Sequence, residues 1–396
     1  MAERVAEIRL AGVRTGSLYQ RPDGCAFVYD AAYLDGGGQP IGHGFDFEAT
    51  EWPIGLHPFF EGLAPEGPRR LREARLADLQ PQDDLGLLLA FGDDLAGSVT
   101  VHPEDDTGEA FSMDQHAAIV PFSEIPLPET TLASLQDTTP VTMVSGVYQP
   151  VPPGRQSAYV ARLPCDPVPN LPENEDLCFR LARLLLGRGD LAEGGLGQVA
   201  TVPGKAMVLR RVDRDRKLNP LRFETTQQIL QRPRGADFTG KYDGQLEEIA
   251  GLIQQISAVP IIDQYKLLQR LIVFCVLNHA DAHLGAFAFV EGERGLRFAP
   301  VTSLVNMAVY LEEGDSPPFA LTIGGERVRL ADLNRDLLVA FGQAMGITHR
   351  AIDRAFDDIS RKRSAVFDRI DGEGPRAPGW RNQFDRTVRT AWARLF

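Results

Sequence analysis

The chain has 396 residues, of which 43% are hydrophobic, so it can bury a full core and is expected to form two domains or lobes. Its formal net charge of −13 argues against binding nucleic acid or an anionic membrane through the bulk of its surface. Its four cysteines include no C-x-x-C pair, which indicates a reducing compartment. No apolar run approaches the ~18 residues of a membrane-spanning helix, and charges stand where a signal peptide needs an apolar core. We therefore expect a soluble, cytoplasmic protein.

The first part of the chain predicts β structure. Short apolar and polar runs alternate over residues 1–50, among them Ala31–Leu34, and glycine-rich breaks separate them, which is typical of hairpins. Two helices, at 58–78 and 82–91, and a strand ending at Val101 are expected next. Residues 102–140 are acidic, proline-rich and weakly periodic. We expect a linker there, and a domain boundary near residue 140.

Helices dominate the predicted elements after that boundary. A strand–turn at 141–149 opens this part, and further strands are expected at 157–163, 206–212, 286–290 and 298–300. Helices are expected at 173–186, 221–230, 243–257, 263–277, 331–345, 349–370 and 380–396. Asp263 is a candidate cap for the most apolar of these helices. The pattern predicts an α+β protein with a β-rich N-terminal lobe and a helical C-terminal lobe.

A polar loop with two histidines follows that apolar helix, and it supports three interpretations. Asp281 could cap a turn between structural histidines. His279, Asp281 and His283 could share one face of a strand and bind a metal. The third interpretation is a kinase-type catalytic loop, in which an Asp after a helix orients the acceptor hydroxyl.

Nine segments, in order, resemble landmarks of the HipA family of bacterial serine/threonine kinase toxins. They are residues 59–67, 91–97, 144–147, 174–182, 211–214, 241–242, 281–284, 304–310 and 323–325. The resemblance implies a protein-kinase-like fold, with a HipA-type N-terminal subdomain over 1–140 and a kinase-like region over 141–396. It also implies ATP and Mg²⁺ as cofactors, a serine or threonine on a target such as a translation factor as substrate, and a small DNA-binding antitoxin as partner.

The resemblance places Asp281 as the catalytic base, with His283 beside it in the same loop. Where the family has Asp-Ala-His-Leu-Lys-Asn-Phe, this chain has Asp-Ala-His-Leu-Gly-Ala-Phe, so Ala286 replaces an Asn that ligates metal. Ser303 replaces the Asp that is the family's second metal ligand. A serine hydroxyl is a weak, neutral ligand for Mg²⁺.

On the nucleotide side, Arg162 stands where the family has a lysine, and an arginine does not reproduce its point-charge geometry. The phosphate-loop segment retains Ser145, Gly146 and Val147 as candidate nucleotide contacts. Met143 and Val151 align with a serine and a lysine of the family. Each departure removes a contact to phosphate or metal.

These departures favour a pseudokinase that acts as a binding or regulatory component of a toxin–antitoxin-type system. One alternative is a weakly active or unconventional ATP-dependent kinase toxin with Asp281 as base. Another is a different enzyme that uses His279 and His283 with a transition metal. We expect a protein partner (an antitoxin-like protein, a related kinase or a translation-factor target), no direct contact with nucleic acid, and no membrane.

Overall fold

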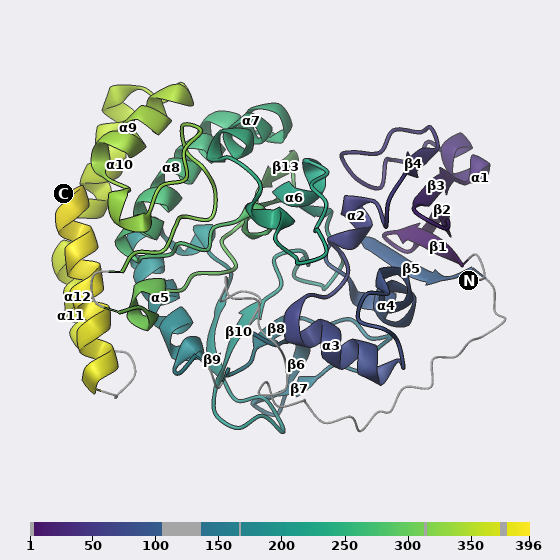
Figure 1. The fold of residues 1–396 in the computed structure, drawn as a ribbon, viewed down its shortest axis with the longest axis horizontal. Helices are drawn as coiled ribbons and strands as arrows, with labels where there is room; N and C mark the ends of the chain where they lie inside the picture. Colours follow the sequence, from purple (N-terminus) through teal and green to yellow (C-terminus); the bar gives the residue numbers. More distant parts are fainter. Residues whose placement is uncertain (1–3, 105–135, 166–167, 313–314, 373–377) are drawn as a thin grey trace. The chain divides into compact units, whose positions relative to one another are not determined.

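The computed structural model describes residues 4–104, 136–165, 168–312, 315–372 and 378–396 (Figure 1). The chain divides into two compact units. The first unit comprises Met1–Val160 and Asp213–Lys241, and the second comprises Ala161–Val212 and Tyr242–Phe396. The chain therefore passes from one unit to the other at residues 160–161, 212–213 and 241–242.

Most of the predicted acidic linker, residues 105–135, lies outside the described part of the chain. The domain boundary near residue 140 stays a prediction. The two compact units have other limits than the predicted domains. The first unit continues to Val160 and also includes Asp213–Lys241.

The first unit contains a five-stranded sheet with strand order β4-β3-β2-β1-β5. All its neighbouring strands pair antiparallel, as hairpin-rich sequence predicts. The turn between β1 and β2 consists of Ala11 and Gly12, both with positive φ (49° and 84°), the geometry that two-residue hairpins favour. The strands are β1 (Val5–Leu10), β2 (Val13–Gln20), β3 (Cys25–Tyr29), β4 (Thr50–Trp52) and β5 (Val99–Pro103).

Four helices accompany this sheet, and one of them corrects a prediction. They are α1 (Ala31–Asp35), α2 (Pro58–Glu61), α3 (Gly67–Leu76) and α4 (Asp84–Phe91). The run Ala31–Leu34 is helical, so the predicted strand there is wrong. The Asp30 carbonyl accepts hydrogen bonds from the amides of Tyr33 and Leu34, which closes a helical turn directly after β3.

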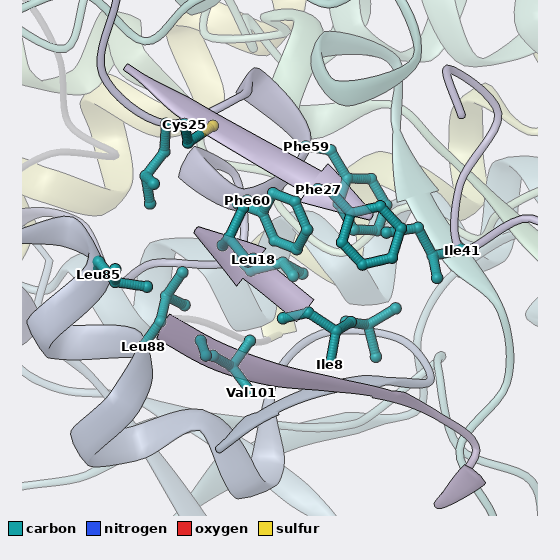
Figure 2. Close-up of a cluster of buried hydrophobic side chains, with 14 of the residues drawn as sticks. Ile8, Leu18, Cys25, Phe27, Ile41, Phe59, Phe60, Leu85, Leu88 and Val101 are labelled. Atoms are coloured by element: carbon teal, nitrogen blue, oxygen red, sulfur yellow. The ribbon is translucent and has the colours of Figure 1, made fainter. Parts of the chain in front are cut away.

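The core of the first unit packs side chains of the sheet against those of α2, α4 and neighbouring loops (Figure 2). Phe27 of β3 meets Phe60 of α2, with ring centroids 6.0 Å apart, and Phe45 lies 5.7 Å from Phe27. Leu85 and Leu88 of α4 are 2% and 0% exposed in the same cluster. Each such side chain contributes roughly 1.5–3 kcal/mol through burial.

A tight hairpin also belongs to the first unit. It joins β6 (Thr138–Val144) to β7 (Val147–Pro150), with Val144 opposite Val147. The strand–turn predicted at 141–149 is therefore confirmed. The next strand, β8 (Tyr159–Arg162), contains the passage into the second unit.

The helix predicted at 221–230 is only partly correct. Residues Phe223–Thr225 form a short strand, β11, and the helix α6 spans Thr226–Ile229. Thr225 accepts a hydrogen bond from the Gln228 amide, and the Gln228 side chain accepts one from the Thr225 amide. This capping box starts the helix at Thr226 and leaves the preceding residues extended.

The second unit is mainly helical and is centred on α8 (Pro260–Val276). Helices α5, α7, α9, α10 and α12 all pack against α8. The other helices are α5 (Leu171–Leu186), α7 (Leu246–Ile256), α9 (Arg335–Ala344), α10 (His349–Ser360), α11 (Arg363–Gly372) and α12 (Pro378–Leu395). None of the helices within the described ranges has the length and apolar character needed to cross a membrane.

Asp263 does not cap α8, which begins three residues earlier with Pro260 at its first position. Proline is favoured there because the first helical N–H has no intrahelical partner. The Asp263 carboxylate instead accepts hydrogen bonds from Ser257 and from the Phe298 amide, and it pairs with Arg297. Although burial opposes its charge, these partners lower the pKa of Asp263.

Two antiparallel strand pairs complete the second unit. They are β9 (Gly194–Gly197) with β10 (Ala206–Arg210), and β12 (Ala288–Gly292) with β13 (Gly295–Phe298). The strand predicted at 286–290 thus begins two residues later, after a 3-10 turn at Leu284–Ala286. The strand predicted at 298–300 corresponds to β13, which ends at Phe298, the first residue of the predicted range.

Candidate functional site

The polar loop after α8 is fixed by backbone geometry at its start. Asn278 takes a left-handed conformation, with φ of 54°, and so turns the chain away from the helix. The amide of His279 then donates to the Phe274 carbonyl, 2.8 Å away. Further along, the Ala280 carbonyl accepts a hydrogen bond of 2.9 Å from the amide of Ala320. The loop therefore presents Asp281 directly after a backbone segment that two hydrogen bonds hold in place.

His279 is a buried, neutral histidine that holds the segment after Ser303. Its Nδ1 accepts a hydrogen bond from the Val305 amide at 3.3 Å, and its ring contacts Phe274 with centroids 4.9 Å apart. Burial lowers the pKa of His279 to about 4. His279 and Asp281 have the spacing of the H-x-D pair in kinase catalytic loops, which is a further signal in the sequence.

The metal interpretation of this loop is wrong. Among the residues that the structure describes, no three His, Cys, Asp or Glu side chains come together in a way that could hold a metal ion. His279 points its Nδ1 at a backbone amide instead. The enzyme that would use His279 and His283 with a transition metal therefore has no support in the described residues.

Asp281 makes a specific contact that the sequence did not reveal. The hydroxyl of Tyr242 donates a hydrogen bond of 2.9 Å to Oδ1 of Asp281. The Tyr242 ring also meets the ring of His283 edge to face, with centroids 5.4 Å apart. Both predicted catalytic residues, Asp281 and His283, are thus brought together around Tyr242, which the sequence marked only as part of a short landmark.

Arg162 forms an ion pair with Glu175 of α5. The Glu175 side chain is 0% exposed and that of Arg162 is 18% exposed. In protein kinases a lysine on a strand pairs with a glutamate on a helix in the same way. Glu175 is therefore a candidate site residue that the sequence did not single out, although it stands in the Asn174-Glu-Asp landmark.

The residues at the two expected metal-ligand positions do not fit Mg²⁺. Ala286 lies in the 3-10 turn after the loop and has no side-chain oxygen. Ser303 is half-buried and offers one neutral hydroxyl. Mg²⁺ is usually held by one or two carboxylates together with substrate phosphates. This set of donors lacks the carboxylate.

The candidate phosphate loop is the turn of the β6–β7 hairpin in the first unit. Ser145 and Gly146 have φ of 50° and 85°, so the turn consists of these two residues, and Val147 already pairs in the strand. Met143 and Val144 beside it are about half exposed, at 49% and 50%. Glycine at this turn meets a conformational requirement of the hairpin itself.

Comparisons with known proteins agree across most of the chain. The family model described as the HipA N-terminal domain matches residues 6–102, and the one described as the HipA-like C-terminal domain matches residues 133–366. "Putative kinase Y4mE" of Sinorhizobium fredii is 26% identical over 377 residues, which cover 88% of this chain and 87% of that protein. "Putative kinase Y4dM" of the same organism is 26% identical over 382 residues, covering 91% of this chain and 90% of that protein.

A solved structure supports the same fold. HipA of Shewanella oneidensis, determined with HipB and operator DNA, superposes with a TM-score of 0.76 at 18% identity, covering 98% of this chain and 96% of that one. The fold is thus an α+β, protein-kinase-like fold. The chain belongs to the HipA family.

Proposed function

We propose that this HipA-family chain is a pseudokinase that acts by binding a protein partner in a toxin–antitoxin-type system. The observation that carries the proposal is the pair of positions 286 and 303, an alanine and a serine where the family has its metal ligands. Transfer of a phosphoryl group relies on positioning and on neutralising charge, and the metal ion supplies much of that neutralisation. Without a carboxylate, a cation bound to the nucleotide phosphates lacks its main protein anchor.

The partner is proposed to be a protein. The solved relative from Shewanella oneidensis is in a complex with HipB and operator DNA, which supports an antitoxin-like protein as one candidate. A related kinase and a translation-factor target are the other candidates. With a net charge of −13, this chain is proposed to reach nucleic acid, if at all, only through its partner.

Three contacts favour a second candidate function, a weakly active serine/threonine kinase with Asp281 as base. The Arg162–Glu175 pair, the brace from His279 and the Tyr242–Asp281 hydrogen bond all remain, so the frame of a kinase site is preserved in the second unit. The two relatives from Sinorhizobium fredii are named as kinases.

Calorimetric titration with ATP, with and without Mg²⁺ or Mn²⁺, separates the two candidates. The unchanged protein is expected to show no binding at millimolar ATP, whereas the double substitution Ala286→Asn with Ser303→Asp restores metal-dependent binding. Asp281→Ala in the double variant is the control for the base, and it should leave ATP binding in place. Metal-dependent micromolar binding by the unchanged protein would reject the pseudokinase proposal in favour of the weak kinase.

A further inference from the structure

The Asp281 carboxylate is part of a closed ring of hydrogen bonds within the second unit. Tyr242 donates its hydroxyl to Asp281 Oδ1 at 2.9 Å, and Arg327 Nη2 donates to the Tyr242 carbonyl, also at 2.9 Å. Arg327 Nη1 donates to the Ala320 carbonyl at 3.2 Å, and the Ala320 amide donates to the carbonyl of Ala280 at 2.9 Å. Ala280 is the neighbour of Asp281 in the chain, so the ring closes.

We infer that Tyr242 is a positioning residue for the Asp281 carboxylate, and that Arg327 holds Tyr242 in place. A hydrogen bond at one carboxylate oxygen fixes the plane of the group and favours its ionised form. The inference goes beyond the proposed function, because it describes how this carboxylate is oriented whether or not the chain transfers phosphate.

Tyr242 is restrained at its backbone carbonyl and at its ring, as a positioning residue must be. Its carbonyl is held by Arg327, and its ring packs against the ring of His283 at 5.4 Å. A tyrosine has only two side-chain torsions, so these restraints largely determine where its hydroxyl lies. The guanidinium of Arg327 thus links Tyr242 to Ala320, whose amide donates to the Ala280 carbonyl.

The first test is carbon-13 NMR of the aspartate carboxyl groups in the full-length protein, with Asp281→Asn used to assign the Asp281 signal. In Tyr242→Phe the chemical shift of the Asp281 carboxyl carbon is expected to change, because the carboxylate loses a hydrogen-bond donor. Tyr19→Phe removes an exposed hydroxyl from the first unit and is the matched control, with no expected change. An Asp281 signal that is the same in Tyr242→Phe and in the unchanged protein would overturn the inference.

Arg327→Gln provides a second variant that leaves the phenol intact. The loss of the guanidinium should shift the Asp281 signal in the same direction as Tyr242→Phe but by less, because the hydroxyl remains and only its restraint is lost. If Tyr242→Phe fails to fold by circular dichroism, Arg327→Gln decides the question. An unchanged signal in Arg327→Gln would then reject the positioning role.

A kinetic measurement shows whether the Tyr242 hydroxyl positions Asp281 for catalysis or obstructs the acceptor position. In the background of Ala286→Asn with Ser303→Asp, Tyr242→Phe is expected to lower kcat roughly tenfold with little change in KM, as loss of part of a base's orientation does. A rise in kcat would show that the Tyr242 hydroxyl obstructs the acceptor position, and would overturn the inference. Lack of ATP binding by the double variant counts against the proposed function, whereas the NMR result still decides the role of Tyr242.

Discussion

Glu175 carries a fully buried carboxylate that forms an ion pair with Arg162. When one member of a buried ion pair is removed, the other is left charged in a poorly solvating environment. We therefore expect Glu175→Ala to lower the free energy of unfolding by about 3–5 kcal/mol, measured by urea denaturation.

The double substitution Arg162→Met with Glu175→Leu should recover most of that loss, because it removes both charges and keeps the volume filled. Glu193→Ala, at an exposed position near the end of the same α5–β9 region, is the control and should change stability by less than about 0.5 kcal/mol. A loss below about 1 kcal/mol in Glu175→Ala would contradict the role of a buried, paired charge.

Two buried histidines make the stability of the protein depend on pH. His57 accepts a hydrogen bond from the Phe59 amide and packs against Phe45 and Trp52, and burial lowers its pKa to about 4, as it does for His279. Both groups bind a proton more readily in the unfolded chain. Their contribution is fully present above about pH 6.5 and is lost as the pH falls toward 4, by at most about 3 kcal/mol for each histidine.

Guanidinium denaturation at pH 7 and pH 5 measures this dependence. In His57→Asn, whose side chain can still accept from the Phe59 amide, the difference in unfolding free energy between the two pH values should shrink by about 2 kcal/mol. His43→Asn, at an exposed histidine of the same unit, should leave the difference unchanged. Equal pH dependence in His57→Asn and the unchanged protein would refute the assignment.

At the scale of single residues, the sequence singled out Asp281 and Arg162 as candidate site residues, but it did not identify the side chains that contact them. Asp281 and Arg162 were found from spacing and resemblance. Tyr242 and Glu175 were not, since they lie 39 and 13 residues away from the groups they contact. A contact over that distance along the chain is set by tertiary packing, which no local pattern encodes.

At the scale of elements, an asparagine joins α5 to a distant loop by imitating the backbone. Asn174 Oδ1 accepts from the Asn306 amide at 3.0 Å, and its Nδ2 donates to the Asn306 carbonyl at 2.9 Å and to the Tyr310 hydroxyl at 3.1 Å. Asn174 is 0% exposed. The two-way pairing uses both halves of the amide, so an aspartate of the same shape cannot replace it.

Asn174→Asp is therefore expected to lower the free energy of unfolding by about 2–4 kcal/mol, because a carboxylate oxygen would face the Asn306 carbonyl in a buried place. Thermal and urea denaturation of the variant measure this loss. Asn382→Asp, at an exposed position of α12, is the matched control and should change stability by less than about 0.5 kcal/mol. If Asn174→Asp were as stable as the control, the amide pairing would not be holding α5.

The periodicity of the sequence located most helices within a few residues, and it failed where a local signal was misjudged. Ala31–Leu34 is too short to show a period of 3.6, so its apolar character alone suggested a strand. Thr225 and Gln228 have the sequence spacing of a capping box, but they lie inside the helix predicted at 221–230. Asp263 was predicted as the cap of α8 because Pro260 was not recognised as the first residue of that helix.

At the scale of the whole molecule, the four cysteine side chains are buried, and none of them is in a disulfide. Burial raises the pKa of Cys275 to about 12 and that of Cys178 further, and it also raises the pKa of Cys25. Because the thiolate is the reactive species, we expect no rapid reaction with a disulfide reagent such as DTNB at pH 8. Four equivalents should react once guanidinium unfolds the chain, and one fast-reacting thiol in the native protein would contradict this expectation.

The sequence predicted the fold class and the family, because family landmarks occur in order along nearly the whole chain. It did not predict that residues 213–241 belong with the N-terminal part. That membership rests on contacts such as those of Arg214, which pairs with Asp94 and donates to the carbonyls of Leu95 and Gly97. These partners are well over a hundred residues away, and nothing in the local sequence around Arg214 points to them.

The interrupted path of the first unit also constrains how this gene can evolve by recombination. A single crossover that imported a new N-terminal segment up to residue 160 would leave the original 213–241 behind. In this chain Arg214 pairs with Asp94, and Arg234 pairs with Asp84. The imported segment would have to provide matching partners for both arginines. Exchange of the whole first unit therefore requires replacement of two separate segments, Met1–Val160 and Asp213–Lys241, at the same time. Inheritance of the two units together is the simpler course, and both family models do match this one chain.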